Sequence, residues 1–172
     1  MDVTRFEEAV MPHLSAAFNL ARWLTGNQQD AEDVVQESYL RALKFFPGFR
    51  GSDGRPWLLA IVRNTCYTWL RSKHREETAT ELDDEMPVAD TSAVNPEALL
   101  LAAARTELVE RALEELPVEY REAVILREVE NLSYKEIAEI AGVPLGTVMS
   151  RLARARDRLQ KLLSQASLGA HA

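Results

Sequence analysis

The chain has 172 residues and a formal net charge of −7, with 47% hydrophobic and 27% charged residues. This composition is ordinary for a soluble globular protein and excludes wholesale disorder, and the length suits one medium domain or two small ones. No apolar run approaches the roughly 20 residues of a membrane-spanning helix. The acidic start MDVTRFEEAV lacks the basic and apolar parts of a signal peptide, so we expect a cytoplasmic protein. Cys66, the single cysteine, excludes an internal disulfide and a cysteine cluster for zinc, and a packed thiol is favoured over a redox sensor.

Charge is distributed unevenly along the chain. Residues 41–75 hold eight basic side chains and one acidic one, and residues 145–163 hold five basic and one acidic. Between them, residues 76–130 hold sixteen acidic and four basic side chains. Two basic segments separated by an acidic one predict contact with a polyanion at two places. For either segment alone, a solvated charged face is the favoured alternative.

Helical periodicity dominates the start of the chain. Apolar side chains recur three and four residues apart over residues 4–25 and predict a helix there. The segment GNQQD (26–30) interrupts this pattern. Asp30 is expected to cap a second helix over about 31–46, whose inner stripe is apolar.

Proline and glycine mark the next boundaries. Pro47-Gly48 ends the second helix. After a loop, Pro56 is well placed in the first turn of a third helix, over about 57–74, which is both aromatic and basic. From there to Asn95 the sequence is acidic, lacks aromatic residues and shows neither helical nor strand periodicity. This composition is typical of a flexible linker.

The remainder of the chain also has helical patterns and no convincing strand. The expected helices cover about 97–115, 117–129, 133–141 and 147–166. We therefore predict an all-α protein made of two small helical domains joined by a flexible acidic linker. The predicted boundaries are 1–75 for the first domain, 76–96 for the linker and 97–172 for the second domain.

The stretch LSYKEIAEIAGVPLGTVMSRLARARDRL (132–159) predicts a helix-turn-helix. Ser133 and Glu136 have the spacing of a capping box, and Gly142 suits the left-handed turn that ends the first helix. Thr147 is expected to cap the second helix, whose basic first turns would enter the major groove of DNA. An amphipathic hairpin with solvated arginines is the alternative, and the motif indicates DNA binding without saying which kind of DNA-binding protein this is.

The segment DAEDVVQESYLRALKFFPGFRGSDGRPWLLAIVRNTCYTWLRSKHR (30–75) resembles region 2 of the extracytoplasmic-function (ECF) sigma factors of bacterial RNA polymerase. It has the acidic helix, the FRG loop and the WLLAIVRN helix of that family. The segment LPVEYREAVILREVENLSYKEIAEIAGVPLGTVMSRLARAR (116–156) resembles region 4 of the same family. The two segments stand in the family order, and the acidic linker stands where larger sigma factors have a third domain.

The resemblance implies a subunit that confers promoter specificity, and no enzyme. Its implied partners are the polymerase core, through the β′ coiled-coil and the β flap, promoter DNA and an anti-sigma factor, which would be the only link to a membrane. No catalytic residue, metal, cofactor or small-molecule substrate is implied. By the same resemblance, the residues that dock on the β′ coiled-coil are Asp33, Gln36, Glu37, Leu40 and Arg41. A solvated face with a Glu37–Arg41 helix pair is the alternative for this set.

Recognition of the promoter −10 element is assigned by resemblance to Phe49, Arg50, Trp57 and Asn64. A base removed from the stack needs polar groups for its edge, flat groups for its face and cations for its phosphates. The polar and basic side chains that could supply these contacts are Arg63, Asn64, Tyr67, Arg71, Lys73 and Arg75. At helical spacing, Trp57 and Trp69 are more often core residues than stacking platforms.

Recognition of the −35 element is assigned to the helix after the GTV turn. The matching positions are Thr147, Met149, Ser150, Arg151 and Arg154, and Arg158, further along, is expected to contact phosphate. Arginine or lysine is common in the family where this chain has Met149. Methionine lacks the bidentate pairing with guanine, so the usual −35 preference is not expected to hold unchanged.

Three other functions are less favoured by the sequence. A sigma-like decoy that binds only an anti-sigma factor would have lost the basic and aromatic promoter residues, which are present here. An ordinary helix-turn-helix repressor would not need the match over 30–75. An enzyme is disfavoured because His13, His74 and His171 are scattered and no glycine-rich phosphate loop occurs.

Overall fold

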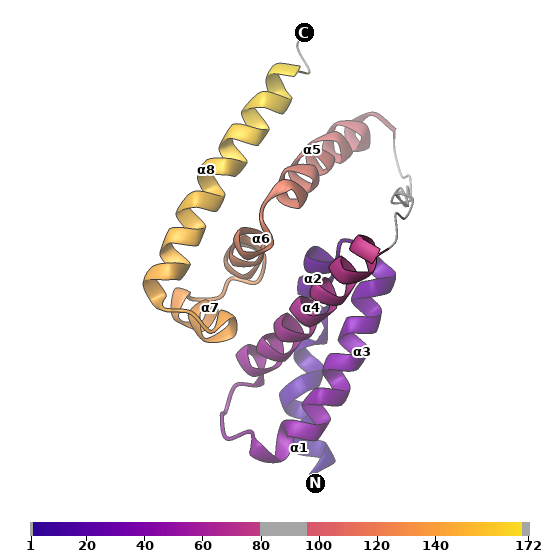
Figure 1. Cartoon of the computed structure of the whole chain (residues 1–172), viewed down its shortest axis with the longest axis vertical. Coiled ribbons are helices and arrows are strands. Elements are labelled where there is room, and N and C mark those ends of the chain that lie inside the picture. The colour runs from indigo at the N-terminus through magenta and orange to yellow at the C-terminus, as the bar shows by residue number, and fades with distance from the viewer. Residues whose placement is uncertain (1, 80–95, 170–172) are drawn as a thin grey trace.

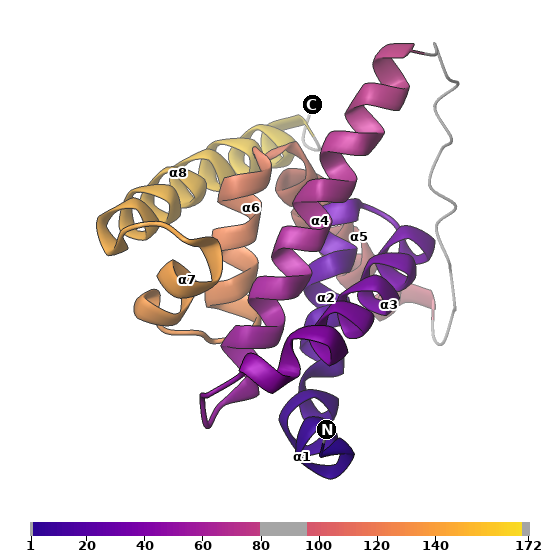
Figure 2. The ribbon, with the colours of Figure 1, turned by 60° about the horizontal axis from the view of Figure 1, so that its bottom comes forward.

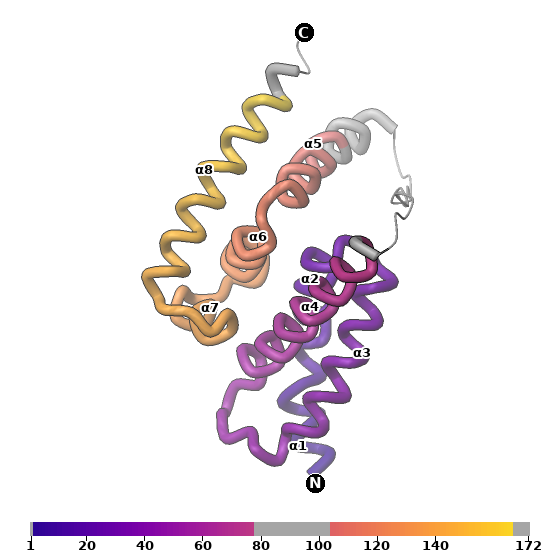
Figure 3. The backbone as a smooth tube through the Cα atoms, in the orientation of Figure 1, coloured from indigo at the N-terminus to yellow at the C-terminus, as the bar shows by residue number. Residues whose placement is uncertain are grey.

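The structure, a computed structural model, describes the backbone of residues 2–79 and 96–169 (Figure 1). Side chains are described for residues 2–77 and 104–166, the ranges that are coloured along the backbone tube in Figure 3. Every regular element in these ranges is helical, which confirms the predicted all-α fold. Most of the segment predicted as a linker lies outside the described residues. The elements in chain order are α1 (Val3–Val10), η1 (Met11–His13), α2 (Leu14–Thr25), α3 (Gln28–Phe45), η2 (Phe46–Gly48), α4 (Gly54–Ala79), α5 (Pro96–Glu115), α6 (Val118–Val124), η3 (Ile125–Val129), α7 (Tyr134–Ala141) and α8 (Leu145–Gly169).

Pro12 divides the helix predicted over 4–25 into two. Helix α1 ends at Val10, a single 3₁₀ turn contains the proline, and α2 begins at Leu14. A proline lacks the backbone N–H that a helix interior needs, and its ring clashes with the preceding turn. Apolar side chains are buried on both sides of the break, Phe6 and Val10 on α1 and Ala17, Leu20, Ala21 and Leu24 on α2.

Asn27, and not Asp30 as predicted, caps helix α3. The side-chain oxygen of Asn27 accepts a hydrogen bond from the backbone N–H of Asp30 at 2.8 Å. The helix therefore begins at Gln28, before the predicted start. Asparagine and aspartate are about equally good N-caps, so residue type alone does not separate them. Asp30 instead stands in the first turn, where a negative charge interacts favourably with the helix dipole.

Helix α4 is longer than predicted at its C-terminal end and starts in close contact with α1. It continues past His74 to Ala79, because the residues REETA that follow contain no helix breaker and favour helix. Pro56 lies in its first turn, as predicted. At Gly54, a Cβ atom would lie 2.1 Å from the backbone carbonyl oxygen of Ala9. Only glycine therefore fits at this helix start.

Helices α7 and α8 form the predicted helix-turn-helix. Ser133 and Glu136 make both hydrogen bonds of the capping box. Gly142 ends α7 in the left-handed conformation, with φ of +67°. The prediction that Thr147 caps α8 is wrong: the helix begins two residues earlier, and Thr147 lies in its first turn. Pro144 directly precedes the helix, and Leu145 is its first residue.

The helix predicted over 117–129 changes winding in its middle. It consists of α6 followed by the π-helix η3, in which the backbone N–H of Glu130 donates to the carbonyl of Ile125 at 3.1 Å. Asn131 then leaves the helix with φ of +56°. A π turn contains one residue more than an α turn and occurs frequently at functional sites.

Buried apolar side chains form one contiguous cluster that includes residues from both halves of the chain. Helix α2 packs against α6, and α4 packs against α7 (Figure 2). Helix α3 lies on the side of the first helical group that faces away from α6, α7 and α8 (Figures 1 and 2). The two helical groups are therefore docked on each other through α2 and α4, while α3 is left uncovered by α6, α7 and α8.

Candidate nucleic-acid and partner interfaces

The outer face of α3 combines charges with an exposed apolar side chain. Asp33, Gln36 and Glu37 are exposed. Leu40 is 64% exposed, although it is apolar and lies on a helix whose other face is buried. Arg41 donates to Glu37 at 2.6 Å, one helical turn away. All five side chains predicted to bind polymerase thus lie on one helix, and Leu40 offers apolar area that no described part of the chain covers.

Phe49 and Arg50 are neighbours in the loop between α3 and α4, but their side chains differ in exposure. Phe49 is only 8% exposed, and its ring lies 4.8 Å from that of Trp57 and 5.7 Å from that of Phe46, measured between centroids. Arg50 next to it is exposed. Phe49 is therefore a core residue that packs against half-buried Trp57. Arg50 faces solvent.

The remaining −10 candidates lie along α4 and fall into two groups. Asn64 and Arg71 are exposed. Lys73 places its ammonium 4.9 Å from the ring centroid of Trp69, which is half-buried. Arg63 and Tyr67 lie on the face of α4 turned toward the second helical group and are half-buried. Asn64 and Arg71 remain accessible to a ligand although each makes a hydrogen bond of 3.3 Å within α4, whereas Arg63 and Tyr67 share a partner on another helix.

That partner is Glu122 of α6, whose side chain is only 1% exposed. One carboxylate oxygen accepts from Nε of Arg63 at 2.7 Å, and the other accepts from the hydroxyl of Tyr67 at 2.8 Å. The guanidinium of Arg63 also lies 3.9 Å from the ring centroid of Tyr67. Burial lowers the pKa of Arg63, but the charge and hydrogen bond of Glu122 outweigh it and raise the pKa overall. Burial first, and then Glu122, raises the pKa of Tyr67.

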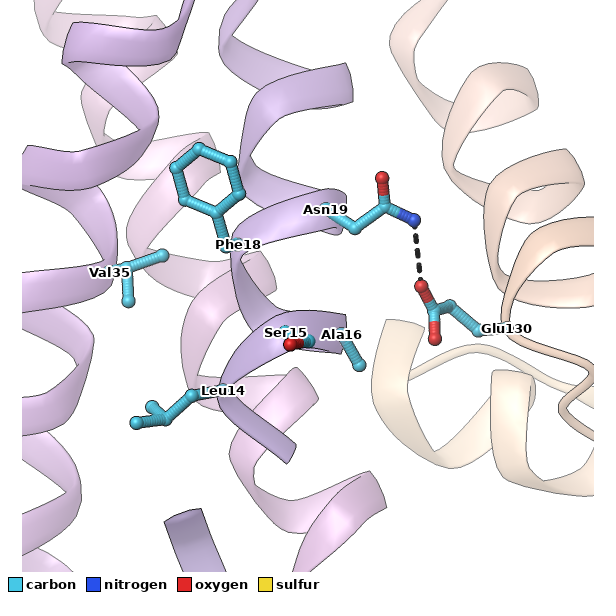
Figure 4. Close-up of a pocket in the computed structure, with 7 residues that line it drawn as sticks. All are labelled: Leu14, Ser15, Ala16, Phe18, Asn19, Val35 and Glu130. Atoms are coloured by element: carbon cyan, nitrogen blue, oxygen red, sulfur yellow. Dashed lines mark hydrogen bonds between the residues drawn. The ribbon is translucent and has the colours of Figure 1, made fainter. Parts of the chain in front are cut away.

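Glu130 makes a second connection between the two groups, at the end of η3. Its carboxylate accepts from Nδ2 of Asn19 on α2 at 2.8 Å (Figure 4) and from Arg55 of α4 at 3.2 Å. Arg55 also donates to the backbone carbonyl of Glu130. Figure 4 shows the contact at the edge of a groove that is lined mostly by apolar side chains. The lining residues are Leu14, Ser15, Ala16, Phe18, Asn19, Val35 and Glu130.

The roles of Glu122 and Glu130 were not predicted from the sequence. The sequence signal for Glu122 is its position within REAVIL, directly before an apolar run and four residues ahead of fully buried Leu126. That spacing places a carboxylate on the inward face of a helix. A buried carboxylate requires a charged or hydrogen-bonding partner, which the sequence does not locate because it lies 59 residues away in the chain.

Helix α8 exposes most of the residues predicted to recognise the −35 element. Met149 is 53% exposed, and Ser150 and Arg154 are also exposed, while Thr147 and Arg151 are half-buried. A surface hollow beside them is lined by Glu119, Tyr120, Pro144, Gly146, Thr147, Ser150, Arg151 and Arg154. The arginines and hydroxyls around this hollow give the start of α8 the donors that base edges and phosphates require.

Arg158 lies further along α8 and is exposed, with its guanidinium 5.2 Å from the ring centroid of Tyr120. Val148 and Leu152, each 1% exposed, hold α8 against the rest of the second group. Helix α8 is thus anchored by its buried side and presents its arginines and Ser150, together with the apolar Leu145 and Met149, on the exposed side, which suits insertion in a DNA groove.

Among the described residues, no group of side chains is suited to metal chemistry, and the single thiol is buried. No cluster of three or more histidine, cysteine or acidic side chains suited to a metal occurs among the described residues. In the same ranges, no helix has the length and apolarity needed to cross a bilayer. Cys66 is fully buried, and burial, followed by the charge of Glu122, raises the pKa of its thiol to about 12. Because the thiolate is the reactive form, Cys66 has the environment of a core residue.

Comparison with protein families gives two matches that cover both helical groups. Residues 9–76 match Sigma-70 region 2, and residues 106–159 match Sigma-70 region 4. The ECF RNA polymerase sigma-E factor of Salmonella typhimurium is 38% identical over 137 residues, which are 76% of this chain and 72% of that protein. The ECF RNA polymerase sigma factor SigE of Mycolicibacterium smegmatis is 35% identical over 164 residues, which are 94% of this chain and 63% of that protein.

Solved structures agree with these matches. The sigma factor RpoE from Bartonella quintana, in complex with the anti-sigma factor NepR, superposes with a TM-score of 0.77 and 30% identity over 94% of this chain and 98% of that one. CnrH in complex with the cytosolic domain of CnrY superposes with a TM-score of 0.64 and 26% identity over 93% of this chain and 88% of that one. The two family matches, the two identities above 30% and the shared fold lead to one conclusion: this chain belongs to the ECF RNA polymerase sigma factors.

Proposed function

We propose that the chain is a promoter-specificity subunit that binds core RNA polymerase through α3 and contacts DNA through α4 and α8. The observation that carries this proposal is the outer face of α3, where exposed Leu40 stands beside Asp33 and Glu37. An apolar side chain ringed by charges is the usual composition of a protein–protein contact. The family membership supplies the partner, which is the polymerase core.

In this proposal the two DNA contacts differ in chemistry. The exposed polar residues of α4, with Arg50 before them, provide donors and cations for a strand whose bases leave the stack. The start of α8 provides Ser150, Arg151 and Arg154 for duplex DNA in the major groove. The chain thus binds the −10 element as it opens and the −35 element while it is paired. Nucleotidyl transfer belongs to the polymerase, and the chain itself has no catalytic role.

The proposed division of the chain places the polymerase and −10 functions in residues 1–75 and the −35 function in residues 97–172. Helix α4 extends the first unit to Ala79. The residues beyond this helix, up to the start of α5, form the proposed linker. We also propose that the protein acts in the cytoplasm, where its polymerase partner works.

Control by an anti-sigma factor is part of the proposal. The similar sigma factor RpoE from Bartonella quintana is bound to the anti-sigma factor NepR, and CnrH is bound to the cytosolic domain of CnrY. If the anti-sigma factor of this chain is membrane-bound, it would be the only connection of the chain to a membrane. A decoy function, in which the chain would bind an anti-sigma factor and not polymerase, is disfavoured because the promoter-contact residues of α4 and α8 are retained.

The deciding experiment is transcription in vitro by core polymerase on a library of promoters, with and without the full chain. The expected result is a set of transcripts that appear only when the chain is present and that share a −10 and a −35 motif. Binding of the chain to core polymerase without any such transcript would favour the decoy. Sequence-specific DNA binding without binding to core would favour a repressor.

A further inference from the structure

Helix α8 leaves two large apolar side chains exposed at its start. Leu145, the first residue of the helix, is 49% exposed, and Met149 is 53% exposed. The two stand four residues apart, which places them on the same face of the helix, one turn above the other. Ala153, a further turn along, is exposed as well. These three residues form an apolar stripe that is separate from the buried side of α8, where Val148 and Leu152 pack.

The apolar stripe runs beside a polar one. Ser150 and Arg154 are exposed and also stand four residues apart, and Arg151 lines the surface hollow with them. Residues 145–163 hold five basic side chains and one acidic one. This charge suits a polyanion. A DNA groove satisfies both stripes, because it has phosphates along its edges and base pairs on its floor.

Gly146, between the two large apolar residues, is a second observation at the same place. A Cβ atom on Gly146 would meet no atom within 4 Å, and its backbone is not left-handed. Neither packing nor conformation therefore requires a glycine at this position, although glycine lowers the stability of a helix relative to alanine. Glycine is also used where a backbone and a ligand approach closely. The start of α8 thus permits a close approach by another molecule.

The chemistry of the apolar stripe selects one base. Thymine alone presents a methyl group, on C5, in the major groove. The side chain of Leu145 has no hydrogen-bonding group, and the thioether of Met149 is at most a weak acceptor. A guanine that faced them would have its N7 and O6 acceptors without a donor. The methyl group of a thymine would instead be buried against apolar atoms.

We propose that Leu145 and Met149 recognise thymine methyl groups in the −35 element, so that this chain selects A·T pairs at the positions that face them. This inference rests on the proposed function and deepens it, because it names the base that the apolar stripe contacts. Ser150 and Arg154 supply the hydrogen bonds to neighbouring base edges and phosphates. Removal of one buried methyl group corresponds to about a fourfold loss of affinity.

Deoxyuridine tests the proposal, because it pairs with adenine as thymine does and lacks only the methyl group. Holoenzyme is assembled from core polymerase and the full chain. Its affinity is measured at fixed salt for double-stranded promoter fragments in which each thymine of the −35 element, on either strand, is replaced singly. At one or two positions the replacement should weaken binding about fourfold. Thymines in the spacer between the two elements are the control and should be replaceable without effect.

Alanine variants assign the effect to the two side chains. In Leu145→Ala and Met149→Ala holoenzymes, replacement of a sensitive thymine should weaken binding less than about 1.5-fold at the position that each side chain contacts, because the methyl group has lost its partner. Leu108→Ala, at a 37% exposed leucine of α5, is the matched control and should keep the full deoxyuridine effect. Since all three side chains are exposed, the substitutions should leave the fold intact.

The outcomes separate this inference from the proposed function. If the holoenzyme selects a −35 motif that lacks A·T pairs, or if every thymine of the motif can be replaced without loss, the thymine assignment is wrong and the promoter function stands. If the variants at Leu145 and Met149 keep the deoxyuridine effect but bind core polymerase more weakly, the apolar stripe contacts the polymerase and the inference is overturned. If the holoenzyme selects no promoter, both proposals fail.

Discussion

The guanidinium of Arg121 on α6 donates to the backbone carbonyl of Trp23, near the end of α2, at 3.0 Å. The same group donates to the carbonyls of Leu113, Glu114 and Leu116 at 2.9 to 3.1 Å. The last carbonyls of a helix have no partner within it. One side chain thus satisfies the C-terminal ends of α2 and α5 together. Burial lowers the pKa of Arg121, and this cost of burying the charge is offset by the hydrogen bonds that it makes.

Arg121→Met should therefore lower the free energy of unfolding by about 2–4 kcal/mol, because it leaves several partly buried carbonyls without donors. Urea denaturation of the full chain measures the loss. Arg105→Met, at an exposed position on α5, is the control and should change stability by less than about 0.5 kcal/mol. An equally small loss for Arg121→Met would mean that water replaces the guanidinium without cost.

Reversing the charges of Asp33 and Glu37 together to lysine should weaken binding to core polymerase at least about tenfold, more at low salt than at high salt. The Glu37–Arg41 pair is exposed, so its loss should leave the fold intact. Surface-immobilised core polymerase measures the affinity. Reversal of Glu7 and Glu8, two exposed acids of α1, changes the net charge equally and should leave the affinity unaltered. If both double variants bind alike, α3 is not the docking helix.

In the second domain, replacement of Arg151 or Arg154 by alanine should cost about 1–3 kcal/mol of promoter binding and relax the preference at one −35 position. Met149→Arg should change which −35 sequences are preferred, because it adds a bidentate donor for guanine. Promoter-library transcription at fixed salt measures both effects. Arg156→Ala is the control, since Arg156 is engaged by Glu128 at 2.9 Å. If the −35 preference were unchanged in both arginine variants, α8 would not be the helix that recognises the −35 element.

Cys66 should make stability fall at alkaline pH. Its pKa is about 12 in the folded chain and about 8.5 in an unfolded one. Between these values the folded state binds more protons, so the contribution of Cys66 is complete below pH of about 8.5 and is lost as the pH rises toward 12. Cys66→Ala should consequently show a flatter decline of unfolding free energy between pH of about 8.5 and 11 than the wild type. If the unfolding free energies of the two proteins declined in parallel with pH, the thiol of Cys66 would not be buried and neutral in the folded chain.

Alkylation provides a second measurement on the same group. Iodoacetamide should modify native Cys66 slowly at pH of about 8, with a rate that rises about tenfold for each pH unit, because only the thiolate reacts. The urea-unfolded chain is the control and should react much faster. Equal rates for the native and unfolded chains would mean that the thiol is exposed in solution.

Local structure was largely predictable from the sequence where one short segment contains all the determinants. The capping box of Ser133 with Glu136 and the left-handed Gly142 involve residues at most a few positions apart, and all are observed. Errors occurred where two nearby residues compete for one role, as Asn27 and Asp30 do, or where apolar periodicity outweighed a breaker, as at Pro12. Periodicity continues through such a break because both helices bury apolar side chains.

Contacts between the domains could not be predicted in the same way. Arg63 has the right type and position for a DNA contact, and Glu122 reads as an ordinary acid in a helix. Their pairing depends on how α4 and α6 meet, which no local pattern encodes. The residues of the candidate −10 site were therefore predicted from the sequence. The hydrogen bonds of Arg63 and Tyr67 to Glu122 were not.

The π-helix η3 determines the direction in which Glu130 points relative to Glu122. Eight residues of regular α-helix would place the two carboxylates about 80° apart around the axis, whereas seven complete almost two turns. The wider turn at Ile125–Val129 takes up roughly one residue, so both acids face α4, opposite Arg63 and Arg55. Deletion of one residue within η3 would preserve this alignment in a regular helix. Substitutions that only tighten the winding would rotate Glu130 away from Asn19 and Arg55 and leave Glu122 in place.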